Sequence, residues 1–289
     1  MTDKKIDMLE PAYPGFPAAL TRIKNVPKRL YYIGDLSLLS RRCVAIVGSR
    51  TTTGYGRNTA KAIARDLAGR GVTVVSGMAS GIDACAHEGA LSCGGGTVAV
   101  LGCGPDICYP ASNHALMGAI AGKGLILSEY PPGTPADPWN FPQRNRIISG
   151  LSEMTIVVQA RDRSGAMITA ELAAEQGRQV MAVPGNIDSR FHLGTNKLIQ
   201  EGVDPIIRIE DAAEALGLGK VMAEDVRLKL SPREQEIFAL ISDRGEMRLD
   251  DICLQLEKSP QYVNPILSVM EMKGVVSSSM GKFFLANIT

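Results

Sequence analysis

Short, uninterrupted apolar runs alternate with helical segments along most of the chain, and this alternation restricts the possible folds more than any other feature of the sequence. An uninterrupted apolar run indicates a strand with both faces buried, as in a parallel sheet that helices cover on both sides. The order strand, helix, strand predicts an α/β fold with a doubly wound, mostly parallel, Rossmann-like sheet. The expected strands lie at residues 44–47, 72–75, 97–101, 125–127, 155–158, 179–183 and 205–207, with helical segments at 57–68, 82–91, 168–176 and 195–200.

The alternation also divides the chain into domains. We expect a Rossmann-like domain over residues 41–217, preceded by an N-terminal lead-in segment over 1–40 in which residues 26–34 form a short strand or a lid. The pattern then breaks at a glycine-containing stretch and a run of mixed charge, which indicate a linker over 218–229. The remaining residues, 230–289, form a second, smaller domain.

The small C-terminal domain starts with a clear helix signal. Ser231 stands at the N-cap position, Pro232 at the first helical position and Glu234 two residues later. Helical segments and an apolar, β-like tail follow, at 232–242, 248–256, 260–273 and 275–285. This outline predicts a winged helix. Because the third helical segment carries Glu271 beside its amide side chains, contact with DNA, contact with a protein and simple stabilisation stay open as roles of this domain.

Bulk composition excludes several classes of function. The formal net charge is only +1, so a nucleic-acid site would have to be a local basic patch. Six cysteines and three histidines form no CxxC pair, which favours reduced thiols over a metal site. The N-terminus MTDKKIDMLEP lacks the apolar stretch of a signal peptide, and no apolar run reaches the roughly 18 residues that span a bilayer. We therefore expect a cytoplasmic protein with no membrane partner, metal or cofactor.

The loops that follow the expected strands are rich in glycine, and ligands of open parallel sheets bind at this edge. In the first loop, Gly48 permits a sharp turn before Ser49 and Arg50. The helix that follows can offer free N–H groups to an anion, and Arg50 can bind a phosphate through two parallel hydrogen bonds. A plain tight turn with an exposed arginine is the alternative.

A further loop, with Ser76, Gly77 and Gly81, is expected to form a nest of backbone amides. Another loop, with Ser164 and Gly165, opens a helix and is preceded by Arg161 and Arg163. Asp83 follows the first of these loops. We expect its carboxylate to cap the next helix rather than to act as a catalytic acid.

A fourth loop combines positive charge with an aromatic ring. Phe141 precedes Arg144 and Arg146 at the start of an expected helix. A single strand of nucleic acid needs this combination, because guanidinium groups bind its phosphates while rings stack on its bases. The alternative is a solvated helix start with Phe141 and Trp139 in the core.

Taken together, these loops resemble the bacterial DNA-processing protein A (DprA/Smf) family. The resemblance rests on GSR at 48–50, SGMASGID at 76–83, GCGPDICYPASN at 102–113, FPQRNRIISGLS at 141–152, SGAMITAELAAEQGR at 164–178 and VPGNIDSRFHLGTNKLIQEG at 183–202. With the N-terminal segments YPGFPAAL and VPKRLYYIGD it covers nearly the whole chain. It implies an extended Rossmann domain that binds single-stranded DNA in a basic pocket. It also implies a homodimer that passes the strand to RecA recombinase in natural transformation.

The resemblance assigns roles to individual residues. It implies that Arg50, Arg144 and Arg146 contact phosphates and that Phe141 stacks on a base. The rest of the expected DNA-binding set is Gly48, Ser49, Ser76, Gly77, Gly81, Asn145, Ser164 and Gly165. Ser80 departs from the family pattern, because many members carry an arginine there, and the expected pocket lacks that positive charge.

An enzymatic function is the alternative. The same fold resembles the nucleotide phosphoribohydrolases of the lysine-decarboxylase-like type, which carry the motif PGGxGTxxE. When the motif is laid on residues 164–172, Gly165 and Thr169 match, but Leu172 takes the place of the glutamate. Glu171 lies about 100° away around a helix. With no catalytic residues identified, the sequence favours a nonenzymatic DNA-binding protein over a nucleotide-binding enzyme of this type.

Overall fold

The computed structural model describes residues 5–218, 230–279 and 281–285. The chain forms two compact units, residues 1–215 and 216–289. Except for Leu218, the expected linker over 218–229 lies outside the described residues. Among the helices of the described segments, none has the length and apolar character needed to cross a bilayer.

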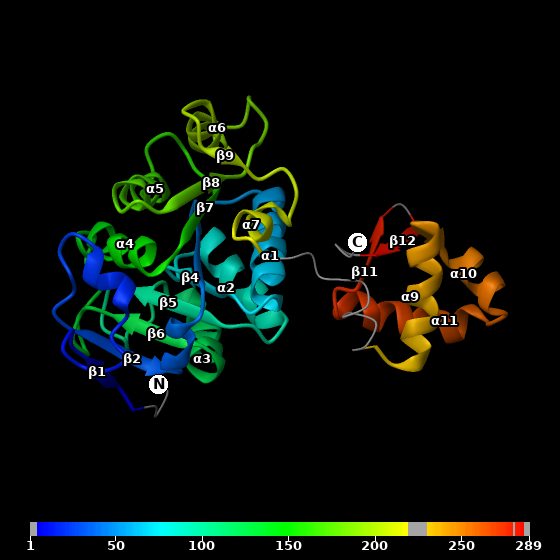
Figure 1. The fold of residues 1–289 in the computed structure, drawn as a ribbon, viewed down its shortest axis with the longest axis horizontal. Helices are drawn as coiled ribbons and strands as arrows, with labels where there is room; N and C mark the ends of the chain where they lie inside the picture. Colours follow the sequence, from blue (N-terminus) through cyan, green and yellow to red (C-terminus); the bar gives the residue numbers. More distant parts are fainter. Residues whose placement is uncertain (1–4, 219–229, 280, 286–289) are drawn as a thin grey trace. The chain divides into compact units, whose positions relative to one another are not determined.

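A nine-stranded sheet organises the first unit (Figure 1). Its strands are β1 (Asp7–Leu9), β2 (Leu30–Gly34), β3 (Cys43–Gly48), β4 (Thr73–Ser76), β5 (Thr97–Leu101), β6 (Leu125–Ser128), β7 (Met154–Gln159), β8 (Gln179–Ala182) and β9 (Asp204–Pro205). They lie in the order β1-β2-β6-β5-β4-β3-β7-β8-β9. Strands β3 to β9 run parallel, whereas β1 and β2 are antiparallel additions at one edge. The expected mostly parallel α/β sheet is confirmed.

Helices cover both faces of this sheet. They are α1 (Gly54–Gly69), α2 (Ile82–Ser92), α3 (His114–Lys123), α4 (Asn140–Leu151), α5 (Gly165–Glu175), α6 (Leu193–Gln200) and α7 (Asp211–Ala215). Helices α1 and α2 pack together on one face, and α4 and α5 pack together on the other (Figure 1). The central strands β3, β4 and β5 are fully or almost fully buried as a result, which explains their uninterrupted apolar runs.

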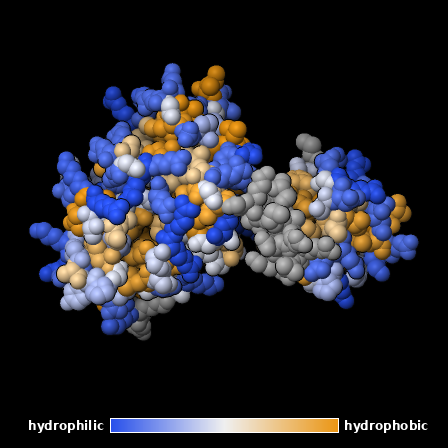
Figure 2. Space-filling model, in the orientation of Figure 1, coloured by the Kyte–Doolittle hydropathy of each residue, from blue (hydrophilic) through white to orange (hydrophobic). Residues whose placement is uncertain are grey.

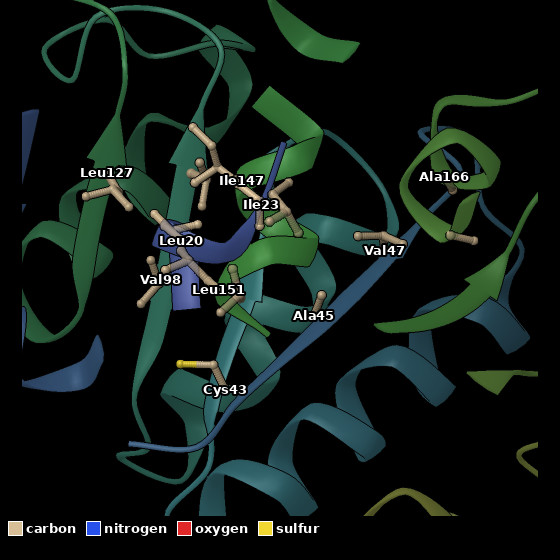
Figure 3. Packing of buried hydrophobic residues seen from close by; sticks show 14 of the residues in the cluster. Leu20, Ile23, Cys43, Ala45, Val47, Val98, Leu127, Ile147, Leu151 and Ala166 are labelled. Carbon is tan, nitrogen blue, oxygen red and sulfur yellow. The ribbon is translucent and has the colours of Figure 1, made fainter. Parts of the chain in front are cut away.

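The lead-in residues belong to the first unit. Within 26–34, the strand interpretation is correct, because β2 pairs with β6 along Tyr31–Gly34. A short 3₁₀ helix, η1 (Ala18–Arg22), packs on α4, where Leu20 and Ile23 meet Ile147 and Leu151 over the sheet (Figure 3). A β-carbon at Gly150 would lie 2.8 Å from Ile23, so a glycine in α4 allows this close approach.

The second unit has its own apolar core. It contains α9 (Pro232–Arg244), β10 (Glu246–Arg248), α10 (Leu249–Leu256), α11 (Pro260–Met272), β11 (Val276–Ser279) and β12 (Lys282–Leu285). The strands form an antiparallel sheet in the order β10-β12-β11. Ser231 is the N-cap of α9 with proline after it, as the sequence predicts. The assignment as a winged helix stays a prediction.

Candidate functional site

The sheet has a point where its winding direction reverses, and a cavity of the first unit opens there. From β3 the chain proceeds through β4, β5 and β6 on one side and returns to β7 on the other. The loops at the carboxyl ends of these strands diverge at such a point and leave a crevice. A cavity of about 560 Å³ occupies it, and a second cavity of about 240 Å³ adjoins it across Phe141.

Most of the residues predicted for the site line these cavities. Those at the larger cavity are Gly48, Ser49, Arg50, Phe141, Arg144, Asn145, Ser164 and Gly165. Gly77 lines the smaller one, where Ser80 also lies. Ser76, Gly81 and Arg146 line neither. The Ser76 hydroxyl instead donates a hydrogen bond of 2.6 Å to the carbonyl oxygen of Ile46 within the sheet.

Phe141 and Arg50 form the accessible part of the site. The guanidinium carbon of Arg50 lies 5.2 Å from the centroid of the Phe141 ring, and the ring of Tyr109 lies 5.3 Å from it on a tilted plane. Arg50 is exposed, and none of the ion pairs among the described residues includes it. Its charge is therefore available to a ligand, next to a partly exposed ring.

Arg144 is buried below this ring. Only 4% of its surface is exposed, and its guanidinium donates hydrogen bonds to the carbonyl oxygens of Gly77, at 2.8 Å, and of Val100. Burial lowers the pKa of Arg144 to about 10, so it keeps its charge at neutral pH. The side chain thus ties the β4 and β5 ends together and supports Phe141 from below, at 5.9 Å from the ring centroid.

The expected amide nest exists, but a carboxylate of the protein itself occupies it. The buried side chain of Asp83 accepts hydrogen bonds from the backbone amides of Ala79, Gly77 and Gly48. Burial raises the pKa of Asp83, and the positive charge of Arg144 opposes that shift. The expectation that Asp83 caps the next helix is wrong, since Gly81 is the N-cap of α2 and the carboxylate reaches back to the preceding loop.

The loops around the nest bind one another closely. The amide of Ser49 donates to the carbonyl oxygen of Gln159 at 2.8 Å, and the carbonyl oxygen of Ser49 accepts from the amide of Ile82 at 3.2 Å. Gly81 has a positive φ of 85°, and a β-carbon there would lie 2.4 Å from that Ser49 oxygen. The glycines of this edge therefore serve loop packing, and the amides of Ser49, Gly77 and Ile82 already have partners.

Arg146 points away from the cavities. Its guanidinium donates hydrogen bonds of 2.7 and 2.8 Å to the Glu129 carboxylate and one of 3.2 Å to the carbonyl oxygen of Gln143. Positions two apart on a helix differ by about 200° around its axis, so Arg144 and Arg146 cannot both face one cavity. The trough expected from three clustered arginines contains Arg50 and Arg144 only.

Trp139 and the start of α5 differ from what the sequence suggested. The alternative that places Trp139 in the core is wrong, because 80% of its surface is exposed.

Asn145 joins α4 to α5 by donating a hydrogen bond of 3.3 Å to the carbonyl oxygen of Gly165. Next to it, the hydroxyl oxygen of Ser164 is buried and has no hydrogen-bond partner among the described residues. Ser164 thus lines the larger cavity with this oxygen closed to solvent.

Tyr109 and Arg161 line the larger cavity although they were not among the predicted site residues. Both follow the end of a parallel strand, and position in such a loop is the signal that could have identified them. The completed site combines exposed guanidinium groups with aromatic rings and a largely apolar floor. Such a surface can bind a phosphate through charge and a flat base through stacking.

Sequence comparisons show which known proteins the chain is similar to. Residues 7–217 match the family described as DNA recombination-mediator protein A. DNA processing protein DprA of Bacillus subtilis (strain 168) is 43% identical over 202 residues, which are 70% of this chain and 68% of that protein. Protein Smf of Escherichia coli K12 is 40% identical over 205 residues, which are 71% of this chain and only 55% of that protein.

Two solved structures are also similar. DNA processing protein A from Streptococcus pneumoniae superposes with a TM-score of 0.70 at 39% identity, over 73% of this chain and 74% of that one. The second structure describes the single-stranded DNA binding mode of DNA processing protein A from Helicobacter pylori. Its TM-score is 0.68 at 35% identity, over 74% of this chain and 96% of that one.

Proposed function

Because the chain belongs to the DNA recombination-mediator protein A family, we propose that it binds single-stranded DNA at the cavity beside Arg50 and Phe141, without cutting the strand. The observation that carries the proposal is the exposed guanidinium of Arg50, which joins no ion pair of the described residues and lies 5.2 Å from a partly exposed aromatic ring. The relative from Helicobacter pylori, whose structure concerns single-stranded DNA binding, gives independent support.

Buried charges below the ring keep the binding surface rigid. Arg144 fixes the β4 and β5 ends, and Asp83 fixes the loops after β3 and β4. A strand that arrives at this surface finds the loops around Phe141 already in place, so less ordering entropy opposes binding. The roles proposed for Arg144 and Asp83 are therefore to position the site rather than to contact DNA.

The test is a titration of labelled oligothymidylate by fluorescence anisotropy. We expect Arg50→Ala to lower the affinity for a single strand about tenfold, since a charge-assisted phosphate contact is lost. Phe141→Leu keeps the apolar volume and removes the ring, and should also cost on the order of tenfold. Emission from Trp139, which precedes Phe141 by two positions and is the only tryptophan, gives a second readout.

The matched control is Arg41→Ala. Arg41 is exposed and precedes β3, so it lies at the amino ends of the strands, opposite the proposed site. Its replacement by alanine removes the same charge as Arg50→Ala. It should leave the affinity unchanged. Wild-type affinity in both the Arg50 and the Phe141 variant, with the fold intact by circular dichroism, would refute the proposed site.

The nucleotide-hydrolysing alternative receives no support from the cavity lining. Asp83 is the only carboxylate among the residues that line the two cavities, and backbone amides bind it. Glu171, the nearest match to the catalytic glutamate of the phosphoribohydrolases, is exposed on α5 and lines neither cavity. Release of free base from nucleoside monophosphates would nevertheless establish this activity.

Three finer roles complete the proposal. We propose that the chain forms a homodimer, delivers single-stranded DNA to RecA recombinase, and carries a winged helix as its second unit. The order of helices and strands in the second unit supports the last of these. Sedimentation of the purified chain tests the dimer, and capture of purified RecA on the immobilised chain tests the partnership.

A further inference from the structure

A second aromatic and basic cluster lies beyond the main cavity. The loop after β8 carries Phe191, and the guanidinium carbons of Arg161 and Arg190 each lie 5.3 Å from the centroid of its ring. Arg161 also lines the larger cavity. The Phe191 cluster, defined as Phe191, Arg161 and Arg190, is therefore continuous with the site beside Phe141.

The loop that carries the cluster is firmly anchored. The side chain of Asn196 binds both the amide and the carbonyl oxygen of Gly185, at 3.1 and 2.9 Å. The ring of His192 is buried, and its Nε2 lies 2.8 Å from the side-chain nitrogen of Gln159 at the end of β7. A β-carbon at Gly185 would lie 2.1 Å from that ring. Phe191 is therefore half-buried on an anchored backbone, which suits a binding residue.

Positive charge gathers around the cluster. Arg161, Arg163 and Arg190 are exposed, and none of the ion pairs in the described parts of the chain contains them. These loops contain two carboxylates, Asp162 and Asp188. Asp162 pairs with Lys197 at 3.1 Å, so Asp188 is the one that can offset the charge of the three arginines. Positive charge is therefore in clear excess around Phe191, although the formal net charge of the chain is only +1.

The surface near α6 also exposes apolar groups. Figure 2 shows hydrophobic side chains among hydrophilic ones in this region of the first unit, where Ile187 is 96% and Leu193 is 54% exposed. Exposed apolar and aromatic groups beside guanidinium groups suit a ligand that has both flat rings and phosphates. An isolated phosphate would use only the charges.

We infer that the Phe191 cluster is a second nucleotide position, so that a strand bound beside Phe141 continues across the carboxyl ends of β7 and β8. A base would stack on the Phe191 ring or on a guanidinium plane next to it, and Arg161 would bridge the two positions. This inference rests on the proposed function and extends its footprint.

The experiment compares strand lengths on the full chain. Anisotropy titrations use oligothymidylates of about 4 and about 20 nucleotides, one short enough for the Phe141 position alone and one long enough for both. Phe191→Ala should lower affinity for the longer strand about tenfold and leave the shorter strand unaffected. Phe191→Tyr, which keeps a ring, should bind both strands as the unmodified chain does. Arg190→Ala should reproduce the length-dependent loss without altering the ring.

The outcomes separate this inference from the proposed function. If Phe191→Ala and Arg190→Ala bind the longer strand with unchanged affinity, or lose affinity equally for both lengths, the second position does not exist. Arg50→Ala should weaken both lengths whatever the result at Phe191. If Arg50→Ala weakens neither, the proposed function itself fails.

Discussion

Gly77 shows how strongly the site depends on a single residue. It lies between two buried groups of opposite charge, and a β-carbon at this position would be 2.7 Å from Nη2 of Arg144 and 2.7 Å from Oδ2 of Asp83. Both neighbours are also held by other residues, Arg144 by the carbonyl oxygen of Val100 and Asp83 by the amides of Ala79 and Gly48, so neither can move without losing hydrogen bonds. Glycine is therefore required here by space rather than by backbone conformation.

We predict that Gly77→Ala destabilises the first unit by about 1–3 kcal/mol, because the added methyl group overpacks a fixed polar core. Thermal unfolding followed by circular dichroism measures the effect. Gly165→Ala is the control, since nothing lies within 4 Å of its would-be β-carbon, and its melting temperature should stay the same or rise. A Gly77→Ala melting curve that matches the unmodified chain contradicts the assignment.

The identity of the site loops was predictable from single residues, but the direction of their side chains was not. Arg50, in the loop after β3, and Phe141, in the first turn of α4, both line the larger cavity, while their contact with DNA stays a prediction. Arg144 and Arg146 were grouped because they are close in sequence, whereas the α-helix turns them to opposite sides. Asp83 was predicted to be a helix cap because it stands next to the start of a helix. The amides that its carboxylate accepts from lie instead before that helix, in Gly48, Gly77 and Ala79.

At the scale of secondary structure, the start of α9 is fixed by an ion pair inside a capping motif. Glu234 accepts hydrogen bonds of 2.8 Å from the amide of Ser231 and 2.6 Å from Lys273 at the end of α11. Burial alone would raise the pKa of Glu234, but the hydrogen bonds from Lys273 and Ser231 outweigh it and lower the pKa below its ordinary value of 4.5. The carboxylate thus joins α9 to α11.

This carboxylate should make the second unit sensitive to acid. A lowered pKa in the folded state contributes stability above the ordinary value of 4.5, and that contribution is lost as the pH falls through the folded-state pKa. We predict that Glu234→Gln costs about 1 kcal/mol at neutral pH and loses less stability on acidification than the unmodified chain. Calorimetry at about pH 7 and about pH 3 measures both effects. Parallel pH dependences in the two proteins contradict this prediction.

Elements with a distinct residue pattern were the predictable ones. The apolar runs placed β3 to β8 within one or two residues, because parallel strands buried on both faces consist mostly of apolar residues. Helix α3 was not predicted, since its sequence HALMGAIAGK has too few polar residues to show a helical period. Strand β1 was not predicted, because it is only three residues long and lies at the edge of the sheet, where it shows no run of buried apolar residues.

At the scale of the whole molecule, the net charge is small, but positive side chains gather at one edge of the sheet. The formal net charge is +1, yet Arg50, Arg161, Arg163 and Arg190 all lie in loops at the carboxyl edge of the sheet and take part in none of the ion pairs of the described residues. Acidic residues elsewhere balance them. Attraction of a polyanion should therefore act at one edge of the first unit.

This distribution predicts how salt acts on binding. Each phosphate contact contributes a slope of about −0.7 to a plot of log affinity against log salt concentration for a single strand. Arg50→Ala should make the slope less negative by about 0.7, and Arg41→Ala should leave it unchanged. Titrations at several potassium chloride concentrations give the slope. An equal change in both variants would mean that overall charge, and not this edge, drives association.

The carboxylate of Asp83 in the amide nest has a consequence for ligand choice. Since the Asp83 carboxylate fills this nest, a lone mononucleotide would bind its phosphate through groups that water also reaches. A polymer is different, because weak contacts repeated along its length add up through effective concentration. On the proposed function, affinity should therefore depend on the length of the strand more than on the identity of any one nucleotide, and a bound strand should leave this edge one weak contact at a time.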